Sequence, residues 1–248
     1  SVDFSNVSPG VYTYTYTVTA PNCPSDQSVV TITVVEQNNA GTAQAPLVIC
    51  ETSTTSINLF NRLNGEDTGG TWTANAGNPT GGTFNAGAGT FNPTGSGVGT
   101  YNFTYTVNNN SECPADKEQV TININNQPSA GTPLPALAAC ATNNQIVLAD
   151  LLNGEDTGGT WTAGGSNPSG GTFNAGSGTF NPNNASEGTF TFTYSFSAEG
   201  GCAADNATVT INVTEQKEAG TAEPALAVCS TDNTPIDLST LLSGEDTG

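Results

Sequence analysis

VYTYTYTV, residues 11–18, alternates aromatic or aliphatic side chains with threonine. The same alternation returns in TYNFTYTV, residues 100–107, and in TFTFTYSF, residues 189–196. Because successive side chains of a strand point to opposite faces, the pattern predicts three strands, each with one apolar face against a core. The apolar positions are Tyr12, Tyr14, Tyr16 and Val18, then Tyr101, Phe103, Tyr105 and Val107, then Phe190, Phe192, Tyr194 and Phe196.

A second alternating strand follows each of these, after a polar loop that carries a cysteine. Its apolar positions are Val30, Ile32 and Val34, then Val120, Ile122 and Ile124, then Val209, Ile211 and Val213. Upstream, the strings TWT, GGTFN and GTFNP are typical of short strands separated by Gly, Asn and Pro turns. Only residues 57–63 and 146–152 favour a helical turn. The chain is therefore predicted to be all-β, with tandem immunoglobulin-like β-sandwich repeats of about 90 residues.

The repeat length comes from three landmarks that recur in step. Ala-Gly-Thr begins at Ala40, Ala130 and Ala219, at intervals of 90 and 89 residues. Two classes of cysteine keep the same intervals: Cys50, Cys140 and Cys229 form the first class, and Cys23, Cys113 and Cys202 the second. We predict the C-terminal part of one repeat at 1–38, complete repeats at 39–127 and 128–216, and the N-terminal part of another at 217–248.

Composition excludes several classes of function. The chain has 22 acidic and 3 basic residues, a formal net charge of −19, and no histidine. Such a surface repels nucleic acid and anionic membranes. Without histidine there is neither a serine–histidine nucleophile nor an imidazole metal ligand. No segment reaches the roughly 18 apolar residues of a membrane span. We expect a protein that is not an enzyme, does not bind nucleic acid and does not insert into membranes.

Cysteines at fixed repeat positions indicate an oxidising compartment. Two pairings fit the sequence. Cys50–Cys113 and Cys140–Cys202 would staple each repeat internally, and this pairing is favoured because each repeat could then fold alone. The alternative clamps neighbouring repeats through Cys23–Cys50, Cys113–Cys140 and Cys202–Cys229. Sequence does not decide between them.

LNGEDTGGTW, residues 63–72, recurs at residues 152–161 and sets two carboxylates beside two glycines and a tryptophan. Adjacent carboxylates point to opposite sides of an extended chain, which disfavours a catalytic pair. Their oxygens suit calcium, and Glu66, Asp67, Glu155 and Asp156 are the candidate ligands. The interpretation we favour is a solvated turn, because Asn-Gly is a strong turn dipeptide.

The aromatic rows allow a rival hypothesis, a binding module on which sugars stack. Because the rings alternate with threonine in a domain that needs a core, burial is the favoured interpretation.

AGT, LVIC, INLFNRLNGEDTGGTW, GTYNFTYTV and CPADKEQVTINI, within residues 40–124, together resemble the repeat unit of giant Bacteroidetes cell-surface adhesins, notably the gliding-motility adhesin family. The resemblance covers the whole chain. It implies export to the cell surface, long filamentous arrays and a role in attachment or gliding, and it gives no catalytic residues. In such a linear array we expect each repeat to contact mainly its neighbours. We expect no cofactor other than calcium at the candidate ligands. The external partner, a surface, polysaccharide or protein, is left open.

Overall fold

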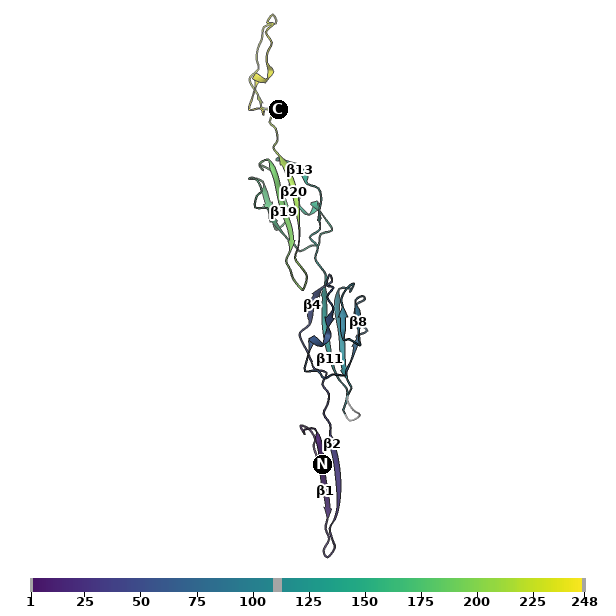
Figure 1. Ribbon diagram of the computed structural model, residues 1–248. Coiled ribbons are helices and arrows are strands. Elements are labelled where there is room, and N and C mark those ends of the chain that lie inside the picture. Colours follow the sequence, from purple (N-terminus) through teal and green to yellow (C-terminus); the bar gives the residue numbers. More distant parts are fainter. Residues whose placement is uncertain (1, 109–112, 247–248) are drawn as a thin grey trace. The chain divides into compact units, whose positions relative to one another are not determined.

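The computed structural model describes residues 2–108 and 113–246. The chain forms two compact units: Ser1–Gln127 together with Glu199–Cys202, and Pro128–Ala198 together with Ala203–Gly248 (Figure 1). The segment Glu199–Cys202 thus belongs to the first unit, although the residues on both sides of it belong to the second. The repeat boundaries at 38, 127 and 216 stay predictions.

The larger sheet of the first unit is built on the hairpin that the alternating pattern predicts. Its strand order is β4-β11-β10-β7; β4 pairs with β11 in parallel, and the other two pairings are antiparallel. The bounds are β4 (Leu47–Cys50), β7 (Thr71–Ala74), β10 (Gly99–Val107) and β11 (Asp116–Asn125). Alternate residues of β10 and β11 are buried, as period-two alternation requires.

A smaller sheet covers the buried face of the larger one. Its order is β5-β9-β8, with bounds β5 (Ile57–Asn58), β8 (Thr83–Asn85) and β9 (Thr90–Asn92). The two layers meet through aromatic rings: Phe103 of β10 lies 4.9 Å from Phe91 and 5.0 Å from Phe84, centroid to centroid. Aromatic pairs at this spacing dominate core packing. The predicted all-β sandwich is confirmed.

The second unit repeats this architecture. Its larger sheet has the order β13-β20-β19-β16 and its smaller sheet β14-β18-β17. The bounds are β13 (Leu137–Cys140), β14 (Ile146–Val147), β16 (Thr160–Ala163), β17 (Thr172–Asn174), β18 (Thr179–Asn181), β19 (Gly188–Phe196) and β20 (Asp205–Thr214).

Short pairs of strands and helical turns complete both units. The two-residue strands are β3 (Thr42–Ala43), β6 (Leu63–Asn64), β12 (Thr132–Pro133), β15 (Leu152–Asn153), β21 (Thr221–Ala222) and β22 (Leu242–Ser243). The 3-10 turns are η1 (Leu59–Arg62), η2 (Ala149–Leu151) and η3 (Leu238–Leu241). Two of them lie where the sequence favours a helical turn. Among the described residues, no helix is long and apolar enough to cross a membrane.

Residues 1–38 contribute one hairpin, β1 (Gly10–Val18) with β2 (Asp26–Val34). Here the expected burial of the aromatic row fails: Tyr16 is 70% exposed, whereas Tyr105, its equivalent in β10, is 1% exposed. The reason is that β10 is covered by a smaller sheet, while β1 pairs only with β2 in the described structure.

Candidate functional site

Asp67, one of the candidate calcium ligands, lies in the loop after β6 and forms hydrogen bonds with the backbone of Asn39. The Asn39 N–H donates to Asp67 Oδ2 at 2.8 Å, and the Asp67 N–H donates to the Asn39 carbonyl at 2.8 Å. Hydrogen bonds to an ionised carboxylate are among the stronger ones in proteins. This reciprocal pair fixes the acidic loop to the segment that enters the repeat.

Two carboxylates of β11 hold the same entering segment. The Ala40 N–H donates to Asp116 Oδ2 at 2.8 Å, and the Ala43 N–H donates to Glu118 Oε1 at 3.0 Å. Ala40 is completely buried. Because buried backbone amides need acceptors, Asp116 supplies the acceptor for the buried Ala40 N–H, and Glu118 supplies one for the partly buried Ala43 N–H. We call Asp67, Asp116 and Glu118 the acid clasp.

Glu66 has a different role in the loop. A Cβ on Gly41, where φ is +88°, would lie 2.9 Å from Glu66 Cβ and 3.1 Å from Asn64 O. The glycine of Ala-Gly-Thr is therefore required by both its left-handed backbone and its close approach to this loop. In the second unit, a Cβ on Gly131 would likewise lie 2.9 Å from Glu155 Cβ.

The second unit repeats two of the three clasp contacts, since Ala207 stands where the first unit has Glu118. Asp156 Oδ2 accepts from the Ser129 N–H at 2.8 Å, and Asp205 Oδ2 accepts from the Ala130 N–H at 2.7 Å. The Asp156 N–H donates back to the Ser129 carbonyl at 2.8 Å. The recurring acidic motif is thus a recurring structural contact.

Calcium at Glu66, Asp67, Glu155 and Asp156 stays a prediction. One oxygen of Asp67 and one of Asp156 already accept a backbone hydrogen bond. Over residues 2–108 and 113–246, no group of three or more Cys, Asp or Glu side chains is arranged to hold a metal ion. Calcium takes six to eight oxygen ligands, so the side chains in place here fit it poorly.

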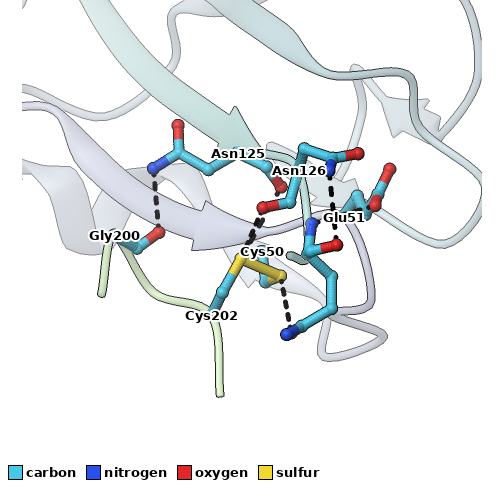
Figure 2. Close-up of a disulfide and its surroundings, with 7 residues drawn as sticks. Cys50, Glu51, Asn125, Asn126, Gly200 and Cys202 are labelled. Carbon is cyan, nitrogen blue, oxygen red and sulfur yellow. Dashed lines mark hydrogen bonds between the residues drawn. A yellow bond between two sulfur atoms is a disulfide. The ribbon is translucent and has the colours of Figure 1, made fainter. Parts of the chain in front are cut away.

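The covalent feature of the first unit is a disulfide between Cys50 and Cys202 (Figure 2). The two Cα atoms are 4.6 Å apart, and the residues are separated by 152 positions in the sequence. Both cysteines are buried, with 2% and 6% of their surfaces exposed. Cys202 belongs to the sequence repeat that follows the one containing Cys50, so the bond joins two successive repeats covalently.

The favoured pairing, Cys50–Cys113 with Cys140–Cys202, is wrong for this structure. Cys50 ends β4 opposite Asn125, the last residue of β11, whereas Cys113 precedes Asp116, the first residue of β11. A strand of 10 residues is about 30 Å long. The two cysteines of one repeat therefore lie at opposite ends of the sandwich, far beyond the roughly 7 Å between Cα atoms that a disulfide tolerates.

The same geometry separates Cys140 from Cys202. Cys140 ends β13 opposite Thr214, the last residue of β20, and Cys202 precedes its first residue, Asp205. The alternative pairing, Cys23–Cys50, Cys113–Cys140 and Cys202–Cys229, is right that repeats are clamped to neighbours but names the wrong partners. In the described structure Cys23, Cys113, Cys140 and Cys229 are thiols.

A tight turn brings Cys202 to Cys50. The Cys202 N–H donates to the Glu199 carbonyl at 2.9 Å, and Gly200 and Gly201 have φ of 58° and 81°. A Cβ on Gly201 would lie 2.7 Å from the Cα of Ile49 and 2.8 Å from the Val48 carbonyl oxygen. The turn therefore packs its backbone directly on the backbone of β4, which glycine permits.

Residues at the end of β11 hold this turn in place. Asn125 Nδ2 donates to the Gly200 carbonyl at 3.0 Å, and Cys202 Sγ lies 3.3 Å from the Asn126 carbonyl oxygen (Figure 2). The Gln127 side-chain amide lies 3.3 Å from Cys50 Sγ. These residues were not identified from the sequence; the signal available was the Gly-Gly pair directly before Cys202.

No protein-family model and no curated protein sequence matches the chain. Several solved structures are similar at 11–16% identity. Three cadherin domains of a mouse clustered protocadherin align with a TM-score of 0.44 (11% identity, 87% of this chain, 80% of that chain). An I-band fragment of titin gives 0.40 (11%, 87% and 76%), and immunoglobulin domains 1–4 of Sidekick-1 give 0.39 (16%, 86% and 60%). At these identities and scores the similarities assign no function.

Proposed function

We propose that these repeats are non-catalytic structural modules of an extracellular filamentous adhesin, in which disulfides tie each repeat to the next. The observation that carries the proposal is the Cys50–Cys202 bond, which joins two successive sequence repeats. A bond of this kind is expected in an oxidising compartment, outside the cytosol. The resemblance to gliding-motility adhesins extends the proposal to attachment or gliding at a Bacteroidetes cell surface.

The disulfide changes how the chain bears tension. Force that enters before Cys50 and leaves after Cys202 passes through the sulfur–sulfur bond. The residues between them then contribute no extension, even when they unfold. For a separation of 152 residues the protected length is about 500 Å of extended chain. A stalk that carries an adhesive part away from a moving cell needs such resistance to lengthening.

The charge of the chain fits the same role. With 22 acidic and 3 basic residues, neighbouring filaments repel one another. Carboxylates of the repeated motif and of the central strands also hold the backbone, since Asp67, Asp116, Asp156 and Asp205 all accept backbone N–H groups. Because these carboxylates are engaged in hydrogen bonds to the backbone, they support the proposal of a structural module over that of an enzyme.

Single-molecule pulling tests the proposal. The chain would be held by its two ends and stretched with and without reductant. We expect the oxidised chain to extend about 500 Å less than the reduced chain when fully unfolded. The Cys50→Ser chain should show the long extension in both conditions. Equal extension of the oxidised and reduced wild-type chains would overturn the proposal.

The rival function, in which the repeats themselves grip polysaccharide or protein, is separated by a binding assay. Beads coated with the chain would be applied to glass and polysaccharide films in calcium and in chelator. A stalk is expected to stick in neither condition. Sticking only with calcium would instead favour a calcium-dependent binding module and ligand roles for Glu66 and Asp67.

A further inference from the structure

One disulfide uses one cysteine of each class, and four thiols of the same two classes are left. Cys50 belongs to the class that recurs at Cys140 and Cys229, and Cys202 to the class of Cys23 and Cys113. If the class determines the partner, the remaining sites should already have the geometry of the bonded ones.

Cys140 lies in the same backbone site as Cys50. Each cysteine is the last residue of a short strand that pairs in parallel with a central strand. Cys50 lies opposite Asn125, the last residue of β11, and Cys140 lies opposite Thr214, the last residue of β20. The next N–H donates to that residue's carbonyl at 2.9 Å in both repeats, and an N–H three positions after each cysteine donates to the cysteine carbonyl at 2.9 Å. At Cys229 the N–H of Asp232 makes the equivalent bond at 3.0 Å.

The turn that carries a second-class cysteine also has the same backbone conformation whether or not the cysteine is bonded. At Cys23 the N–H donates to the Ala20 carbonyl at 3.2 Å, as that of Cys202 does to Glu199 at 2.9 Å. The residue before each cysteine is left-handed, with φ of 67° at Asn22 and 81° at Gly201. Because Cys23 is a thiol, this turn is a property of the hairpin and not a product of the bond.

We propose that every first-class cysteine bonds to the second-class cysteine of the repeat that follows it, so that Cys140 and Cys229 accept the cysteine-bearing turn of a further repeat. Cys23 and Cys113, as second-class cysteines, would each bond to the first-class cysteine of the repeat that precedes their own. This inference rests on the proposed function and specifies the partner of each remaining thiol: a second copy of the same module, presented through its hairpin turn.

The bond forms by thiol–disulfide exchange with a disulfide oxidant such as oxidised glutathione. The Cys140 thiolate attacks one glutathione sulfur, which gives a mixed disulfide and releases one glutathione thiol. The incoming cysteine thiolate then attacks the Cys140 sulfur and releases the second glutathione, so two protein thiols are oxidised and one glutathione disulfide is reduced. The Thr142 hydroxyl lowers the pKa of the Cys140 thiol, which increases the thiolate fraction available for attack.

This register, in which each first-class cysteine bonds to the second-class cysteine of the next repeat, makes the loops closed by successive disulfides overlap. Cys140 lies between Cys50 and Cys202 in the sequence, so the loop that its disulfide closes would start inside the Cys50–Cys202 loop. The shortest covalent route through the array then runs from Cys202 to Cys229 and onward through the next bond. Only these 27 positions, about 95 Å of extended chain, would lengthen in every two repeats.

An extended chain in which residues 128–216 are duplicated in tandem tests the register. After refolding with oxidised and reduced glutathione, remaining thiols are alkylated and the chain is digested after glutamate without reduction. The two copies of Cys140 then lie in peptides of different mass, because the first begins after Glu118 and the second after Glu215 of the first copy.

We expect the first Cys140 peptide linked to residues 200–215 and the second Cys140 peptide alkylated. Cys202→Ser in the added copy alone should remove this link and leave the Cys50 peptide linked. The register is overturned if both Cys140 peptides are alkylated, or if the link survives that substitution. The Cys50 link in the same digest reports the proposed function separately, since its absence would overturn that proposal instead.

Discussion

At the scale of single residues, the Tyr105 hydroxyl explains the shape of the acidic loop. It donates to the Asp67 carbonyl at 2.8 Å and accepts from the Gly70 N–H at 2.9 Å. A Cβ on Gly70 would lie 2.5 Å from the ring, so the ring occupies the space that this glycine leaves. In the second unit Tyr194 makes the same two bonds, to Asp156 and Gly159, each at 2.8 Å. One core residue per repeat therefore positions the loop that carries the first carboxylate of the clasp, Asp67 or Asp156.

Removing this hydroxyl should destabilise the repeat without changing its fold. Tyr105→Phe leaves the partly buried Gly70 N–H without its acceptor, and a hydrogen bond of this kind contributes about 0.5–1.5 kcal/mol. We expect a loss of that size in the free energy of unfolding, measured by denaturant with Trp72 as the fluorescent probe in a Trp161→Phe background. Tyr16→Phe is the matched control, because Tyr16 is 70% exposed, and it should change stability little. Equal effects of the two substitutions would show that the Tyr105 hydroxyl does not stabilise the loop.

At the scale of elements, alternation was sufficient to predict the strands but not the cysteine partners. β10 and β11 bury alternate residues, and η1 lies within the predicted helical stretch. The Asn64-Gly65 turn is also present, with Gly65 at φ +75°. Connectivity was missed because it depends on which end of β11 the short strand β4 joins, and that parallel pairing links residues more than 70 positions apart. Periodicity identifies which residues are equivalent, but it does not show which of them lie together.

The approach of the Cys202 turn to β4 can be tested with two neighbouring glycines. Both have positive φ, so an alanine at either position meets backbone strain of about 1–2 kcal/mol. Gly201→Ala would also place its Cβ 2.7 Å from the Ile49 Cα, whereas Gly200→Ala meets only the Asn125 side-chain amide, which can move. Overpacking against fixed atoms adds about 1–3 kcal/mol.

We therefore expect Gly201→Ala to weaken the Cys50–Cys202 bond more than Gly200→Ala. The measurement is the fraction of oxidised chain across a series of glutathione redox buffers, read by mass after alkylation. Gly201→Ala should need a more oxidising buffer than Gly200→Ala to reach half oxidation. If the two variants have the same midpoint, close backbone packing of this turn does not determine the strength of the bond.

At the scale of the whole molecule, one bond constrains more than half of the chain. Its ends are 152 of 248 positions apart. On the chain-entropy model a closed loop of this length stabilises the folded state by about 5 kcal/mol. The stability of the array and its resistance to stretching thus have the same covalent origin. The acid clasp and the Tyr105 hydroxyl shape each repeat, and the disulfide joins one repeat to the next.

The measurement that tests the joining of successive repeats most directly is a peptide map of the oxidised chain, alkylated and digested after glutamate without reduction. Cleavage after glutamate places each of the six cysteines in its own peptide, with Cys50 in 37–51, Cys113 in 113–118 and Cys202 in 200–215. We predict that 37–51 is linked to 200–215, as Cys50–Cys202 requires. A link between 37–51 and 113–118 would report Cys50–Cys113 instead, and would contradict the joining of successive repeats.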